Sequence, residues 1–113
     1  MEPQEIKFEV QGSSPTPYVV TFVRRSIRNL SAYCTCPAGD KGQYCKHRFN
    51  ILDGEIDAIV SNNLQDIKLV QSWLPGSDIE EAIKNLRDLE LAAANIKKQL
   101  TAAKKYVAKV MRD

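Results

Sequence analysis

Residues 34–47 of the chain read Cys-Thr-Cys-Pro-Ala-Gly-Asp-Lys-Gly-Gln-Tyr-Cys-Lys-His, and this stretch decides the fold. It contains all three cysteines and the only histidine of the 113 residues. The spacing is Cys-x-Cys, then eight residues, then Cys-x-His. Three thiolates and one imidazole form the ligand set of a tetrahedral structural zinc site. The sequence therefore predicts one structural Zn²⁺ ion bound by Cys34, Cys36, Cys45 and His47.

Other interpretations of this cluster stay open at the level of the residues. Buried structural cysteines beside an unrelated histidine would give the same composition, although such clustering is rare. A Cys/His nucleophile pair would need partners placed from elsewhere in the chain, whereas the histidine follows Cys45 at a spacing typical of metal ligands. Iron also accepts thiolates, but the mixed sulfur and nitrogen set favours zinc. Four protein ligands leave no open position for water, so we expect a structural ion and no enzymatic activity.

The residues before the cysteines predict three short strands. Residues 5–10 alternate apolar and charged side chains, as a half-buried strand does. Residues 18–24 and 30–34 are rich in β-branched and aromatic residues. Because side chains alternate along a strand, Cys34 and Cys36 point the same way and one segment supplies two ligands. Pro37 is expected to end the strand and to lead into a flexible loop.

The residues after the cysteines predict helices. A helix should begin at Cys45 and end at Asp53-Gly54, with a further helical turn or two over residues 55–60. A second amphipathic helix is expected over residues 62–74, with Leu64, Ile67, Val70 and Leu74 on its apolar face. The fold class is therefore α+β. The expected divisions are a β-rich zinc-finger module (1–54), a connecting helical part (55–76) and a long C-terminal helix (77–113).

The order Cys-x-Cys, variable loop, Cys-x-His resembles the SWIM zinc-finger family. The likeness covers residues 18–52 and includes Cys34-Thr-Cys36-Pro37, Cys45-Lys46-His47 and the apolar helix after them. The resemblance implies a β-hairpin followed by a helix, in a ββα arrangement. It also implies that Cys34, Cys36, Cys45 and His47 are the zinc ligands. Members of the family are thought to bind DNA or proteins, so the resemblance implies a partner of one of these kinds.

Six basic residues near the predicted metal site are candidates for contact with nucleic acid, since Arg and Lys pair well with phosphate. They are Arg24, Arg25, Arg28, Lys41, Lys46 and Arg48. The alternative is a solvated basic face or a protein-binding surface. Three thiolates on Zn²⁺ leave a charge of about −1, which nearby cations would offset without any nucleic acid.

Residues 77–113 have the pattern of one long helix. Ser77-Asp78-Ile79-Glu80 has the form of a capping box. Apolar residues then recur with gaps of three and four over more than four heptads, without Pro or Gly. These ten positions form the predicted association seam: Ile79, Ala82, Leu86, Leu89, Ala93, Ile96, Leu100, Ala103, Val107 and Val110.

The length of this helix indicates a partner for its seam. A helix over residues 78–111 spans about 50 Å, more than the diameter of about 34 Å of a compact globule of this size. In an antiparallel pair Glu90 would face Lys97 or Lys104, whereas a parallel pair brings no opposite charges together at the flanking positions. We therefore predict an antiparallel coiled coil, in a homodimer or with the preceding helix. The alternative is a long helix packed wholly within one subunit.

Composition bounds the class of protein. The net charge is +2, with +3 over residues 1–50, −5 over 51–80 and +4 over 81–113. No apolar run approaches the roughly 20 residues that cross a bilayer. The acidic N-terminus also lacks the basic segment followed by an apolar segment that a signal peptide has. We expect an intracellular protein, cytoplasmic or nuclear, that neither associates with a membrane nor acts on a small-molecule substrate.

The expected function is that of a zinc-stabilised binding or adaptor protein that associates with DNA or another nucleic acid in DNA transactions. The alternative is a pure protein–protein interaction module that recruits a partner through its C-terminal helix. In both cases the zinc ion stabilises the fold.

Overall fold

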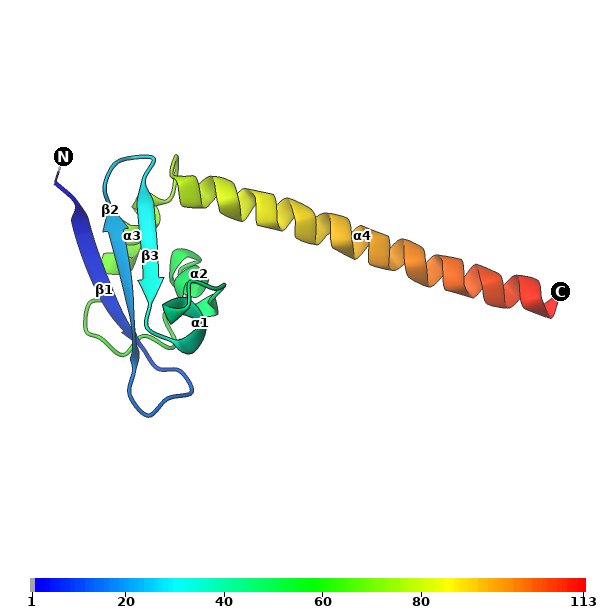
Figure 1. The fold of residues 1–113 in the computed structure, drawn as a ribbon, viewed down its shortest axis with the longest axis horizontal. Helices are drawn as coiled ribbons and strands as arrows, with labels where there is room; N and C mark the ends of the chain where they lie inside the picture. Colours follow the sequence, from blue (N-terminus) through cyan, green and yellow to red (C-terminus); the bar gives the residue numbers. More distant parts are fainter. Residues whose placement is uncertain (1) are drawn as a thin grey trace. The chain divides into compact units, whose positions relative to one another are not determined.

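The computed structural model describes residues 2–113, and the chain divides into two compact units, Met1–Glu80 and Glu81–Asp113. A three-stranded sheet precedes four helices, which confirms the predicted α+β class (Figure 1). The elements are β1 (Gln4–Val10), β2 (Tyr18–Arg24), β3 (Leu30–Cys34), α1 (Pro37–Asp40), α2 (Lys46–Leu52), α3 (Asp66–Trp73) and α4 (Asp78–Arg112).

The sheet is antiparallel in the order β1-β2-β3, so β2 is its central strand. The second and third strands have the predicted bounds, and the first begins one residue earlier than expected. Phe8 pairs with Val20, and Val20 pairs with Cys34. All three side chains are buried, so they form one row across the inner face of the sheet. This register joins a predicted zinc ligand directly to the apolar core.

Two helices complete the core of the first unit. α2 contributes Ile51 and Leu52, and α3 contributes Ile67, Val70 and Trp73. The predicted helix over 62–74 is shorter than expected, because it begins at Asp66 and ends at Trp73. Its apolar face also differs: Leu64 is exposed and Leu74 half-buried, while Trp73 takes the core position.

Residues 55–60 form no helix, although the Ile59 N–H donates to the Ile56 carbonyl at 3.0 Å and closes a single turn. This segment instead runs along β1, where Ile59 forms an antiparallel bridge with Val10. The main-chain N–H of Val60 donates to the Glu9 carbonyl at 2.9 Å, and that of Gln11 donates to the Ala58 carbonyl at 2.8 Å. The edge of β1 has main-chain donors and acceptors to satisfy. Pairing with that edge therefore prevails over the weak helical pattern of the segment.

The start of α4 is tied to the first unit by a capping arrangement. The Glu80 N–H donates to Ser77 Oγ at 3.1 Å, as the capping box predicts. The return bond differs, because the Glu80 carboxylate accepts from the Gly76 N–H and not from Ser77. Asp78 is also held, since its carboxylate accepts from the Leu30 N–H at 3.1 Å.

α4 itself is one uninterrupted helix of 35 residues, as predicted. None of its residues is buried in the described chain. Within residues 2–113, no helix combines the length and the apolar character that crossing a membrane requires.

Candidate metal centre

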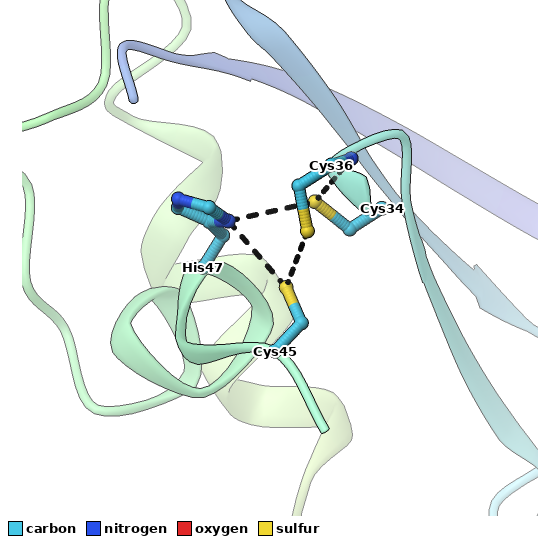
Figure 2. Close-up of side chains that lie close together, drawn as sticks. All are labelled: Cys34, Cys36, Cys45 and His47. Atoms are coloured by element: carbon cyan, nitrogen blue, oxygen red, sulfur yellow. Dashed lines mark hydrogen bonds between the residues drawn. The ribbon is translucent and has the colours of Figure 1, made fainter. Parts of the chain in front are cut away.

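The four predicted ligands come from the ends of three consecutive elements. Cys34 is the last residue of β3, Cys36 is the N-cap of α1, Cys45 is the N-cap of α2, and His47 is the second residue of α2. All three cysteines are buried, and the histidine is half-buried. Figure 2 shows the three sulfur atoms and the imidazole pointing toward one common centre.

The distances between the ligand atoms fit a single tetrahedral ion. All four atoms lie within 4.8 Å of one another. His47 Nδ1 is 3.8 Å from Cys34 Sγ and 3.5 Å from Cys45 Sγ, and the Sγ atoms of Cys36 and Cys45 are 3.4 Å apart. Zinc–sulfur bonds of about 2.3 Å place two sulfurs of a tetrahedron about 3.8 Å apart. The side chains present therefore fit one structural Zn²⁺ ion, with Nδ1 as the histidine ligand atom.

The segment after Pro37 was predicted to be a flexible loop, but it contains a short helix, α1. Proline is well suited to the first position of a helix, and Cys36 caps it by accepting the Gly39 N–H on its Sγ at 3.3 Å. Gly39 also permits a close approach, since a Cβ there would lie 2.7 Å from both Cβ and the carbonyl oxygen of Cys34. The turn is thus packed tightly against the first ligand.

The environment of the cluster shifts the pKa values of two of its thiols in opposite directions. Burial raises the pKa of the Cys34 thiol to about 12; the hydrogen bond from the Cys36 main chain opposes this rise, and the side chains of Cys36 and Cys45 add to it. Burial also raises the pKa of Cys45, but hydrogen bonds from the Arg48 main chain, Cys36, Cys34 and His47 outweigh burial and bring that pKa to about 6. A bound zinc ion would dominate these effects, because coordination deprotonates a thiol outright.

Comparison with known families agrees with this geometry. Residues 8–48 match the family model of the SWIM zinc finger. This segment is a SWIM zinc finger. The match includes all four ligands and ends one residue after His47, and it leaves α3 and α4 outside. No curated protein and no solved structure matches the chain.

The SWIM finger holds its histidine with two residues that the sequence did not single out. The Tyr18 ring lies 5.2 Å from the His47 ring, centroid to centroid, at a tilt of 49°. Gly12 lies against both, because a Cβ at this position would be 2.4 Å from Tyr18 Cε2 and 3.4 Å from His47 Nε2. One signal was available: Tyr18 shares the period of two with the core residues Val20 and Phe22, so it faces inward.

The six basic candidates do not gather at one place. Arg24, Arg25 and Arg28 lie at or just after the end of β2, in the connection to β3. Lys41, Lys46 and Arg48 lie beyond the other end of β3, around α1 and the start of α2. Figure 1 shows the β2–β3 connection and α1 at opposite ends of these strands.

Three of the arginines already have interactions within the protein. The Arg48 guanidinium donates to the carbonyls of Ala32 and Gln43, so it links β3 to the loop between the ligand pairs. Arg25 donates to the hydroxyls of Ser31 and Tyr33, and this interaction lowers the pKa of Tyr33. Arg28 also interacts within the protein. Lys41 and Lys46, in contrast, extend from exposed positions.

A groove of about 780 Å³ lies beside the ligands. Tyr18, Tyr44 and Lys46 form part of its lining, together with Cys36, Cys45 and His47. Glu55 and Asp57 also line the groove. One lysine and two carboxylates therefore share the lining of this groove.

Proposed function

We propose that this zinc-finger protein is an adaptor that associates with nucleic acid and acts in DNA transactions, without enzymatic activity of its own. The proposal is supported by an exposed surface beside the zinc ligands. We call it the ligand loop surface and define it as Lys41, Tyr44 and Lys46. All three residues are exposed, and they lie in or beside the loop between the second and third zinc ligands. The zinc ion thus fixes the segment that carries them.

The chemistry of the ligand loop surface suits a nucleic acid strand. Its two lysines can contact phosphates. Tyr44 is 66% exposed, and its ring stacks on Phe49 with centroids 4.6 Å apart and an interplanar angle of 22°. An exposed ring supported from behind is a platform on which a base can stack. The two lysines would attract the phosphate backbone of the strand, and the tyrosine ring would stack on a base.

A binding role fits the metal better than a catalytic one. Four protein ligands close the coordination shell, so the ion has no position for a reacting water. Cys45 and His47 both belong to the cluster of metal ligands, which argues against their use as a nucleophile pair. The zinc ion then acts through the shape of the finger that it stabilises.

Fluorescence anisotropy of the zinc-loaded chain with labelled single-stranded and duplex DNA tests this proposal. We expect binding at low salt, and we expect K41A/K46A to weaken it and to reduce the slope of log affinity against log salt by about one per lysine. The charge-matched control is K7A/K68A, which alters two exposed lysines away from the loop. The absence of binding at low salt, or equal losses in both double variants, would contradict the proposal.

A second candidate is a protein–protein module that recruits its partner through α4. The exposure of Leu89, Ile96 and Leu100 favours it. A pull-down from the native host with and without nuclease separates the two candidates. Partners that persist after nuclease treatment support recruitment through protein contacts, whereas partners lost with nucleic acid support the adaptor described above.

A further inference from the structure

The seam positions of α4 are exposed from Ala82 to Val110, whereas the first one, Ile79, is half-buried. Leu89 is 60% exposed, Ile96 63% and Leu100 54%. Helices in water gain most of their stability from packing an apolar face and little from propensity alone. A regular heptad stripe along a helix of 35 residues therefore indicates that another helix covers it.

The charges of α4 identify what kind of helix would fit. Residues 78–95 carry five acidic residues (Asp78, Glu80, Glu81, Asp88, Glu90) and two basic ones (Lys84, Arg87). Residues 96–112 carry six basic residues and no acidic one (Lys97, Lys98, Lys104, Lys105, Lys109, Arg112). A parallel pair of these helices would place the basic half against the basic half. An antiparallel pair places the acidic half of each chain against the basic half of the other, which is favourable.

We propose that α4 pairs with α4 of a second copy of this chain as an antiparallel coiled coil, in the register where Ala93 of one chain faces Ile96 of the other. In this register all ten heptad positions are paired. The five distinct layers, each occurring twice, are Ile79–Val110, Ala82–Val107, Leu86–Ala103, Leu89–Leu100 and Ala93–Ile96.

The volumes of the side chains favour this arrangement over a parallel one. Each of the three seam alanines faces a larger residue, so every layer holds at least one branched aliphatic side chain. In a parallel pair each alanine would face its own copy, which would leave three layers underfilled. Well-filled layers matter because a cavity in an apolar interface is destabilising.

The residues beside the seam select one register. In the proposed register Glu90 of each chain lies across from Lys97 of the other, which gives two ion pairs around the two-fold axis. A shift of one heptad in one direction places Lys97 against Lys97. A shift in the other direction places Glu90 against Glu90. Only the proposed register of these three has opposite charges at the centre.

The pairing has a consequence for how two fingers would be presented. Each finger unit leads into the start of its own α4, so the two Asp78 residues lie about one helix length apart, or about 50 Å. This inference does not depend on the binding of nucleic acid, and its failure would leave the proposed function standing.

Sedimentation equilibrium of the full zinc-loaded chain tests the dimer. We expect a dimer at micromolar concentration, and we expect Leu89→Asp to weaken it by about 100-fold or more, because two buried carboxylates would face Leu100. Leu91→Asp is the matched control, since Leu91 lies outside the seam and is 72% exposed. Zinc content confirms that each variant keeps its finger. A chain that is still monomeric at roughly 0.1 mM, 100 times the concentration at which we expect the dimer, would overturn the proposal. Equal effects of the two substitutions would also overturn it.

A charge-swap cycle tests the direction and the register. Glu90→Lys and Lys97→Glu should each weaken the dimer by about tenfold, because each turns two attractive pairs into repulsive ones. The double variant E90K/K97E should restore the affinity to within about threefold of the original chain. Lys98→Glu, the same charge change at a position away from the seam, is the control for net charge. Losses that add in the double variant would rule out this antiparallel register.

Discussion

The two units of this chain are stabilised in opposite ways. In the described chain every buried residue lies at or before Ser77, and residues 81–113 bury none. The first unit combines a small core with a cluster of four metal ligands. The second is a single helix whose main-chain hydrogen bonds are internal and whose apolar stripe is exposed. The metal ion stabilises the finger, whereas α4 would gain its stability from packing against a partner helix.

Loss of zinc should produce the largest difference between the units. Metal binding by small zinc fingers is worth about 10–16 kcal/mol, comparable to the whole stability of a small domain. Chelation, or Cys36→Ser, should therefore unfold the first unit and abolish the near-ultraviolet circular dichroism of the buried Trp73. Much of the far-ultraviolet helical signal should remain, because α4 has 35 helical residues against four, seven and eight in the other helices.

Thr35→Ser is the control for this experiment. It changes the residue between two ligands but keeps the hydroxyl that accepts the Val19 N–H at 2.9 Å. It should bind zinc and keep the near-ultraviolet spectrum. An unchanged spectrum after verified removal of the metal would show that zinc is not structural here.

Truncation of one large side chain in each unit should give the next largest contrast. Trp73 is 2% exposed in the core of the first unit, whereas Leu91 is 72% exposed on α4 and lies outside the seam. Trp73→Ala should lower the free energy of unfolding of the first unit by about 3–5 kcal/mol. Leu91→Ala should change stability by no more than about 0.5 kcal/mol. Differential scanning calorimetry measures both, and similar losses would mean that α4 packs more extensively than its exposure indicates.

The sequence predicted the parts of the molecule that depend on local patterns. The spacing of Cys34, Cys36, Cys45 and His47 led to the zinc cluster, because the ligand chemistry is restrictive and the residues are close in the chain. β2 and β3 were predicted with their observed bounds, since alternation and β-branched content agree there. The long helix followed from an unbroken heptad pattern.

The parts that were missed depend on contacts between residues far apart in the chain. Residues 55–60 pair with β1 because that edge needs hydrogen-bond partners, which no local pattern reveals. Trp73 replaced Leu74 in the core because the position of α3 against α2 decides which face is buried. The hydrogen bonds from the Arg48 guanidinium to carbonyls of two other segments were also not indicated by the local pattern. Whether nucleic acid contacts any of the six basic residues stays a prediction.

The smallest expected effect lies at the junction of the two units. Ser77 is 3% exposed, and its hydroxyl caps α4 by accepting the Glu80 N–H. Ser77→Ala should cost about 1 kcal/mol, the usual effect of removing an N-cap side chain. Hydrogen exchange should show the loss in the first turn of α4 and in the adjoining finger unit, with the rest of α4 unchanged.

The control Thr101→Ala removes a hydroxyl that bonds to the Lys97 carbonyl in the middle of α4, and its effect should stay within about 0.5 kcal/mol. Loss of protection along the whole of α4 in Ser77→Ala would mean that the two units unfold as one. The contrast between a metal-stabilised finger and a partner-stabilised helix would then fail.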